Sequence, residues 1–285
     1  MPRRKCVSVF GVKTALKNVL KKLRAKDVLP IQKVTDPDKT LEGKVAFVAG
    51  GSGGIGMAVA EALLDSGARV VLGGTKAEKL RACMDKLGHS DRIAFVVMDA
   101  SNAEASDQVV SEATRAFGNI DIFVESTGVH TEGVNFWTMT PEEYDRVMSI
   151  NLRGAFFLAR SVAQHMIDSN TKGHILFVNS SRGFEPAWSA YGLSKWGLKG
   201  FTQGLAQTLL PYGIVVNGIA PGSTATPLIG VKEGDAISSN ENGAGRLATP
   251  TEIAEWAKML VGPSGDLVIG ETVLVSGGRG GIDVR

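Results

Sequence analysis

The chain has 285 residues, enough to bury the core of one α/β domain or of two small domains. Its 44% hydrophobic and 21% charged residues exclude an intrinsically disordered protein, and no apolar run reaches the roughly 18 residues that a membrane-spanning helix needs. The two cysteines, Cys6 and Cys83, exclude a disulfide framework and a cysteine-built zinc site, and the four histidines lack metal-ligand spacing, so we expect no bound metal.

The first 40 residues differ from the remainder in charge. They hold 11 Lys and Arg against 3 Asp and Glu, a balance of +8, whereas the remainder holds 20 and 26, a balance of −6. Apolar residues recur there at helical spacing, which predicts a basic amphipathic helix over residues 9–26, followed by a linker. This extension could dock on a subunit, lie on an anionic membrane surface, or be a mobile or targeting tail. It lacks the apolar region and cleavage site of a secretory signal, and we expect a cytoplasmic protein.

From Lys44 onward, short apolar runs alternate with helical segments. The runs that we expect to be strands lie at 44–50, 68–74, 92–99, 120–127, 173–181, 214–222 and 271–278. Continuous apolar runs of this kind are typical of strands that are buried on both faces. The pattern predicts an α/β fold with a Rossmann-type doubly wound parallel sheet, in a single domain over residues 41–285 with residues 1–40 as a basic N-terminal helical extension.

A glycine-rich turn stands between the first strand and the first helix. Glycine allows a tight turn and lets the backbone approach a pyrophosphate, whose charge then lies against the helix N-terminus. Because a strand precedes the turn and a helix and a second strand follow it, the turn predicts a dinucleotide site. The residues of this turn that we expect to bind the cofactor are Gly50, Ser52, Gly53, Ile55 and Gly56.

The end of the second strand bears on which dinucleotide binds. An NAD site typically has an acidic residue there that holds the ribose hydroxyls, but this chain reads Gly73-Gly74-Thr75-Lys76. Thr75 can donate a hydrogen bond to a 2′-phosphate and Lys76 can supply positive charge, so NADP is favoured over NAD, although Lys76 could equally begin a solvated helix. Asp99, at the end of the third strand, could accept from the adenine amino group or only cap the next segment.

Several further motifs follow in order along the chain. AGGSGGIG at 49–56 is similar to TGxxxGIG, Asn151 lies in SINLRGAFF, VNSS ends at Ser181, YGLSK pairs Tyr191 with Lys195, and PGSTAT begins at Pro221. Together, over residues 41–279, they resemble the short-chain dehydrogenase/reductase family. The resemblance implies an oxidoreductase that transfers hydride between NADP(H) or NAD(H) and a carbonyl or secondary alcohol substrate.

The resemblance also implies roles for individual residues. Tyr191 would act as general acid in reduction and general base in oxidation, and Lys195, four residues on and on the same helical face, would lower the pKa of the Tyr191 phenol. Ser181 would hydrogen-bond the substrate oxygen, and Asn151 would hold a water on a proton route from Lys195. The remaining cofactor contacts implied are Gly128, Tyr191, Lys195, Pro221, Gly222 and Thr226.

Two departures from the family pattern bear on the site. Glu125 in ESTG replaces an asparagine that usually braces the central strands, so the local hydrogen bonding must differ. Only nine residues separate Ser181 from Tyr191, fewer than the family has, so that either Ser180 or a shifted backbone could take the place of Ser181. The same segment brings candidate substrate residues, and Arg182 could either contact a polar substrate or pair with Glu185. These candidates are Arg182, Phe184 and Trp188.

The substrate, the partners and a second function class remain open at this point. Residues 227–246 form a short, polar, glycine-rich segment that we expect to be a lid, and the candidate substrates are a small or medium carbonyl compound, a sugar acid or polyol, a 3-oxoacyl thioester or a steroid. The resemblance implies a homo-oligomer, a tetramer or dimer, built through the long helices after the fourth and fifth strands. The alternative function is a non-catalytic dinucleotide-binding sensor or scaffold, and no nucleic-acid partner is expected.

Overall fold

A computed structural model of the chain describes residues 39–232 and 234–282. The amphipathic helix expected over residues 9–26 lies outside the described residues, and so does most of the predicted extension. None of the helices in the described ranges is both long enough and apolar enough to cross a membrane.

Seven parallel strands form one sheet, in the order β3-β2-β1-β4-β5-β6-β7. The strand bounds are β1 Val45–Ala49, β2 Arg69–Gly74, β3 Ile93–Val97, β4 Ile122–Glu125, β5 His174–Val178, β6 Val215–Pro221 and β7 Thr272–Val275. The order reverses direction between β1 and β4, so the carboxyl ends of these strands open a crevice there. This topology confirms the predicted doubly wound parallel sheet.

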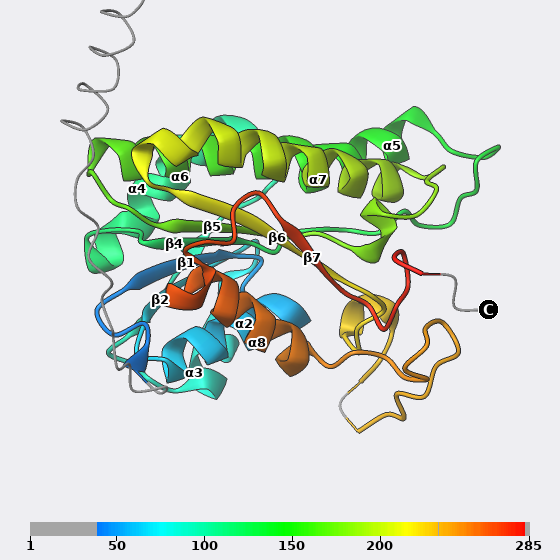
Figure 1. The fold of residues 1–285 in the computed structure, drawn as a ribbon, viewed down its shortest axis with the longest axis horizontal. Helices are drawn as coiled ribbons and strands as arrows, with labels where there is room; N and C mark the ends of the chain where they lie inside the picture. The colour runs from blue at the N-terminus through cyan, green and yellow to red at the C-terminus, as the bar shows by residue number, and fades with distance from the viewer. Residues whose placement is uncertain (1–38, 233, 283–285) are drawn as a thin grey trace, which may run out of the picture. The chain divides into compact units, whose positions relative to one another are not determined.

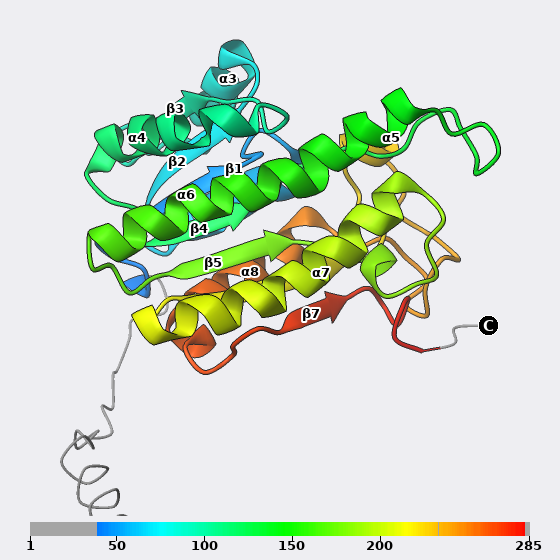
Figure 2. The ribbon, with the colours of Figure 1, turned by 90° about the horizontal axis from the view of Figure 1, so that it is seen from above.

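Helices cover both faces of the sheet (Figure 1). One face carries α2 (Gly54–Asp65), α3 (Ala77–Leu87) and α8 (Pro250–Val261). The other face carries α4 (Ser106–Phe117), α5 (Pro141–Met148), α6 (Ala155–Asp168) and α7 (Ala190–Leu209), of which α6 and α7 run across the sheet in Figure 2. The sheet is therefore the middle layer of three.

The strand β1 shows why continuous apolar runs occur in this sequence. Successive side chains of a strand point to opposite faces. Ala46 and Val48 pack into the core under α2 and α8, whereas Phe47 and Ala49 pack into the core under α4, α6 and α7. All are fully buried, so every position of the strand must be apolar.

A π-helical turn, Ser149–Gly154, joins α5 to α6 into one nearly continuous rod (Figure 2). Such turns widen the helix by one residue and often occur at functional positions. Asn151 lies in this turn and is 1% exposed. The turn therefore directs an amide side chain into the interior of the protein, beside the carboxyl end of β4.

Glu125 ends β4 and is 1% exposed. Its Oε1 accepts hydrogen bonds from the Thr127 amide, at 2.7 Å, and from the Thr127 hydroxyl, whereas Oε2 has no hydrogen-bond partner in the described part of the chain. Burial raises the pKa of the Glu125 carboxyl, and the Thr127 bonds and the charge of Lys195 oppose this effect. The Glu125 carboxyl is thus bonded to its own loop through one oxygen, and its other oxygen has no partner among the described residues.

Replacing Glu125 should change how stability depends on pH. The raised pKa means that the folded protein holds this proton where the unfolded chain has lost it, so wild-type stability falls as pH rises from the unfolded pKa towards the folded one. Because Glu125→Gln cannot ionise, its melting temperature relative to wild type should rise between pH 5 and pH 8, by about 2–4 °C per kcal/mol of relieved penalty. The exposed control Glu61→Gln should show a constant difference; a constant difference for Glu125→Gln would contradict the assignment.

Candidate active site

The first two turns of α7 carry the Tyr191 and Lys195 pair. The Ser189 side chain caps this helix by accepting from the Gly192 amide at 3.2 Å, so Tyr191 and Lys195 lie on one helical face. Lys195 Nζ lies 5.8 Å from the centre of the Tyr191 ring. The ammonium is buried and donates to the Val178 carbonyl at 2.9 Å, at the carboxyl end of β5.

The pKa values of this pair depart from the expectation. Burial raises the pKa of the Tyr191 phenol above its usual value, and the opposing influences are a hydrogen bond with Ser180 and the charges of Arg182 and Arg279. Burial also lowers the pKa of Lys195 to about 8, with Glu125 opposing the change. The expected lowering of the tyrosine pKa by Lys195 is therefore wrong for the protein by itself, because desolvation acts on both partners.

Ser180 is the serine that influences the Tyr191 phenol. A hydrogen-bonding influence of Ser180 is among the causes that lower the pKa of the Tyr191 phenol against burial, and the Ser180 Oγ accepts from the Arg182 amide at 3.2 Å. Ser181 begins a 3₁₀ turn, and its Cβ lies 3.6 Å from where a Cβ on Gly280 would stand. The structure thus brings the alternative serine to the tyrosine, because the short segment before α7 turns immediately after Ser180.

Asn151 and Gly128 complete the surroundings of Lys195. The Asn151 amide nitrogen donates to the Val129 carbonyl at 3.0 Å and to Ser194 Oγ at 3.2 Å, and Asn151 Oδ1 accepts from the Val129 amide at 2.8 Å. A Cβ on Gly128 would lie 3.6 Å from Asn151 Oδ1 and 3.8 Å from Lys195 Nζ. The loop after β4, the π-helical turn and α7 therefore meet at the lysine.

The glycine-rich turn meets two other segments at the carboxyl edge of the sheet. Gly50 has φ +75°, and a Cβ there would lie 2.7 Å from the Ser126 carbonyl, so only glycine fits. A Cβ on Gly54 would lie 2.6 Å from the Thr226 methyl group, which places the PGSTAT turn beside the start of α2. The N-cap residue of α2 is Gly53, which has no side chain that could accept a hydrogen bond from the first amides of the helix. A bare backbone and an uncapped helix N-terminus fit the pyrophosphate of a dinucleotide.

The other predicted cofactor residues lie around this turn in different ways. Ser52 Oγ lies 3.2 Å from where a Cβ on Gly74 would stand, above the end of β2. Ile55 packs partly into the core, Gly53 is the N-cap residue of α2, and Gly56 is a buried residue in the first turn of this helix. Pro221 ends β6, and the Gly222 amide donates to the Val275 carbonyl at 3.0 Å. The Gly222 N–H is thus engaged in the sheet, and Thr226, which is 5% exposed, remains the candidate for the nicotinamide end.

No acidic side chain directly follows β2. Thr75 and Lys76 are both exposed there, and Lys76 is the N-cap residue of α3, without a side-chain capping bond. Asp99 is exposed, and its Oδ1 accepts from the Ser101 amide at 2.9 Å and the Ser101 hydroxyl at 2.7 Å. One oxygen of Asp99 therefore caps the following turn, which is one of the two roles expected for this residue. The other expected role is to accept from the adenine amino group.

A cavity of about 230 Å³ opens beside Tyr191. Arg182 and Trp188 line it, as predicted for substrate contacts, whereas Phe184 lies outside it, with Lys199 Nζ 3.8 Å from the centre of its ring. Arg182 also donates to Glu185 at 2.9 Å, so the pairing expected between them is present.

Sequence reasoning missed His130 as a residue of this cavity. Its ring centre lies 4.2 Å from that of Tyr191, and burial lowers its pKa, which keeps the imidazole neutral at neutral pH. Its place two residues after Gly128, in the loop that borders the site, was the available signal.

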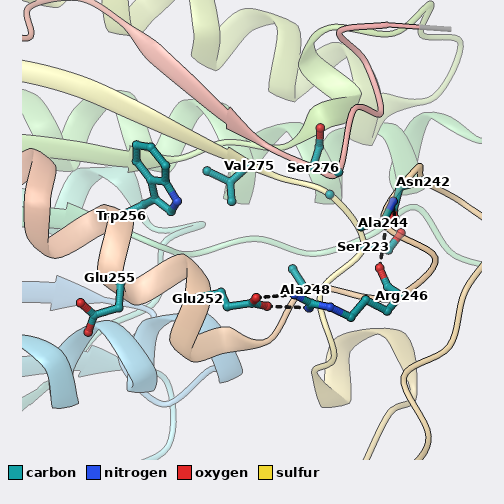
Figure 3. Close-up of a pocket in the computed structure, with 12 residues that line it drawn as sticks. Ser223, Asn242, Ala244, Arg246, Ala248, Glu252, Glu255, Trp256, Val275 and Ser276 are labelled. Carbon is teal, nitrogen blue, oxygen red and sulfur yellow. Dashed lines mark hydrogen bonds and ion pairs between the residues drawn. The ribbon is translucent and has the colours of Figure 1, made fainter. Parts of the chain in front are cut away.

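A second cavity, of about 410 Å³, lies between α8, the end of β7 and the loop before α8 (Figure 3). Trp256 and Val275 lie on one side of it, and the Arg246–Glu252 ion pair lies on another. None of the predicted catalytic side chains lines it. Groups of three or more His, Cys, Asp or Glu side chains with metal-binding geometry do not occur within the described ranges.

Comparisons with known proteins agree with this geometry. A family model described as short chain dehydrogenase matches residues 44–235. The acetoacetyl-CoA reductase of Acinetobacter sp. (strain RA3849) is 34% identical over 244 residues, covering 83% of this chain and 98% of the relative. The 3-oxoacyl-[acyl-carrier-protein] reductase FabG of Vibrio cholerae is 33% identical over 242 residues, covering 84% and 98%.

Solved structures agree as well. The 3-ketoacyl-(acyl-carrier-protein) reductase from Brucella melitensis, complexed with NADH, superposes with a TM-score of 0.77 at 29% identity, covering 84% of this chain and 99% of that one. A point variant of actinorhodin polyketide ketoreductase with NADPH gives 0.76 at 26% identity, covering 84% and 98%. On these matches and on the fold, the chain belongs to the short-chain dehydrogenase/reductase family and is an NAD(P)-dependent oxidoreductase that transfers hydride.

Proposed function

We propose that Tyr191 is the proton donor and acceptor of this reaction and that Ser180 hydrogen-bonds the substrate oxygen. The observation that carries the proposal is that Tyr191 lines the same cavity as Arg182 and Trp188, with Ser180 near enough to influence the pKa of its phenol. The two hydroxyls can then contact the same carbonyl oxygen. This assigns to Ser180 the role expected of Ser181.

The residues around Tyr191 supply and hold the proton. A bound nicotinamide dinucleotide supplies the hydride in reduction and accepts it in oxidation. Tyr191 gives its proton to the substrate oxygen in reduction, and Ser180 donates a hydrogen bond to the charge that develops there. Lys195, whose pKa is about 8, exists near neutral pH in both protonation states and can return a proton to the tyrosinate. Asn151 holds the loop at Val129 beside the lysine and keeps this route in place.

If Ser180 is the serine that contacts the substrate oxygen, three variants should differ in how far kcat falls. Tyr191→Phe should lower kcat by at least about 10²-fold because the proton donor is lost. Ser180→Ala should lower kcat by about 10²-fold because one donor to the developing charge is lost, and Ser181→Ala should lower it by less than about tenfold. Steady-state kinetics with NADPH and a carbonyl substrate measures all three, and unchanged NADPH binding by Ser180→Ala and Ser181→Ala is the control. A larger loss in Ser181→Ala than in Ser180→Ala would return the role to Ser181.

We also propose that NADP is preferred over NAD. The support is the exposed Thr75 and Lys76 at the end of β2, where no carboxylate would repel a 2′-phosphate. Ser52 Oγ, above Gly74, adds a hydroxyl at the same place. The cofactor would then lie along the carboxyl edge from β2 to Thr226.

A charge change at Thr75 tests this preference. Wild type should bind NADPH more tightly than NADH, and Thr75→Glu should weaken NADPH binding by about tenfold or more, because it places a carboxylate against the 2′-phosphate. Fluorescence transfer from the protein's four tryptophans to the reduced nicotinamide measures both affinities. Ser111→Glu, the same added charge on an exposed residue of α4, is the matched control. Tighter NADH binding by wild type would reject NADP as the preferred cofactor.

For the substrate we propose a carbonyl compound whose reacting end fits the 230 Å³ cavity beside Tyr191. Acetoacetyl thioesters are the first compounds to test because two relatives bear the names of 3-oxoacyl thioester reductases.

We propose further that residues 1–40 form an extension to the domain, which agrees with a family match that begins at residue 44. We also propose that the enzyme acts in the cytoplasm.

A homo-oligomer through α6 and α7 is part of the proposal. Phe156 on α6 and Leu193 and Trp196 on α7 are 41–43% exposed, so both helices present apolar side chains to solvent. Sedimentation equilibrium of wild type should give a dimer or tetramer, and Phe156→Glu should lower that mass because it places a charge in the contact. Trp137→Glu, at an 87% exposed loop position, should not. A monomeric wild type would contradict this contact.

A further inference from the structure

The segment that follows β7 packs against the loop of the candidate active site. Gly280 has φ +78°, and a Cβ there would lie 3.0 Å from the Ser181 carbonyl and 3.2 Å from Phe184 Cβ. The Ser276 hydroxyl donates to the Arg279 carbonyl at 2.6 Å and holds the backbone of this segment in its turn. The last described residues of the chain therefore touch the residues that come directly after Ser180.

The Arg279 side chain joins three segments that lie far apart in the sequence. Its Nε donates to Glu185 Oε1 at 2.8 Å, in the loop between Ser180 and Tyr191. One terminal nitrogen of its guanidinium donates to Glu241 Oε2 at 2.7 Å and to Ser223 Oγ at 3.2 Å. The Arg279 and Glu185 side chains are only 19% and 17% exposed, so this ion pair is partly shielded from water.

Glu185 connects Arg279 to a residue that lines the cavity. Its second oxygen accepts from Arg182 at 2.9 Å, and its backbone carbonyl accepts from Trp196 Nε1 at 2.7 Å. Arg182 lines the cavity beside Tyr191. Arg279 therefore fixes the carboxylate that in turn orients a guanidinium at the cavity wall.

The loop over residues 237–247 is held at the same place. The Gly243 amide donates to the Gly277 carbonyl at 2.9 Å, and the Leu247 amide donates to the Ile237 carbonyl at 2.8 Å. Figure 3 shows Ser223, Asn242 and Ser276 gathered where this loop meets the end of β7. Removing the Arg279 guanidinium would take one ion-pair partner from both Glu185 and Glu241, so their carboxylates would no longer hold the two loops together through it.

We propose that Arg279 is a positioning residue of the reaction: it ties the 237–247 loop to the loop that carries Ser180 and, through Glu185, sets Arg182 at the substrate cavity. The inference rests on the proposed function, because it takes the cavity beside Tyr191 as the substrate site. Arg279 acts through other residues, so its loss should weaken substrate binding more than it slows the chemical step.

Two measurements on the full-length chain test the proposal. In Arg279→Met, the amides of residues 181–188 should exchange hydrogen for deuterium faster than in wild type, by about tenfold, and the KM for the carbonyl substrate should rise by about tenfold. The affinity for NADPH should change by less than about twofold, and kcat should fall by a smaller factor than KM rises, because Arg279 reaches Tyr191 only through its charge. Arg279→Lys, which keeps the charge but cannot bridge both carboxylates in the same way, should lie between wild type and Arg279→Met.

Arg246→Met is the matched control. Arg246 lies in the same 237–247 loop, but its guanidinium donates to Glu252 at 2.8 Å and to the Leu247 carbonyl at 3.0 Å, away from the loop of the active site. This variant should leave the exchange of residues 181–188 and the KM unchanged. If Arg279→Met leaves exchange and KM unchanged, or if Arg246→Met changes them equally, the proposal is rejected.

The coupling through Glu241 gives a further test, which separates positioning from a general loss of structure. If Arg279 acts by joining the two carboxylates, Arg279→Met should change KM less in a Glu241→Gln background than in wild type. Additive effects would overturn the link. Retained activity in Tyr191→Phe would instead reject the proposed function, so the two failures can be told apart.

Discussion

A buried ammonium is the constraint around which the site is built. Lys195 is 4% exposed and donates to the carbonyl that ends β5, so the first turns of α7 cannot shift relative to the sheet without breaking that bond. Taking an ammonium out of water is costly, which is why the pKa of Lys195 falls to about 8. Tyr191, Asn151 and Gly128 all take their places around this group.

Glu125 offsets part of the cost of burying the Lys195 ammonium, but its own carboxyl is buried as well. Its carboxyl stands at the end of β4, next to the strand whose last carbonyl holds Lys195, and its charge favours the protonated lysine. The same burial raises the pKa of the Glu125 carboxyl, and one of its oxygens is left without a partner in the described part of the chain. The protonation states of Glu125 and Lys195 therefore influence each other, which an asparagine at position 125 could not do because it does not ionise. The pH dependence of this enzyme should be sought in the pair and not in Tyr191 by itself.

Outside the buried centre, ion pairs connect the segments that surround the substrate cavity. Arg182, Glu185, Arg279 and Glu241 form one continuous chain of opposite charges. Most of these contacts join residues more than 30 positions apart, so they restrain loops that lie between the helices and strands. A rigid sheet with variable loops at its carboxyl edge is the arrangement in which such contacts decide substrate choice.

Much of the protein could be predicted from local patterns in its sequence. The strands, the glycine-rich turn, the spacing of Tyr191 and Lys195 and the absence of an acid directly after β2 depend on neighbours in the chain, because periodicity, turn chemistry and helical spacing are local properties. Only the tertiary structure decided that Ser180 influences the Tyr191 phenol, that the His130 ring contacts the Tyr191 ring, and that Arg279 reaches Glu185. Those contacts depend on where each side chain points and on how distant segments pack, and desolvation, which moved the pKa of Tyr191 upward, exists only once the chain is folded.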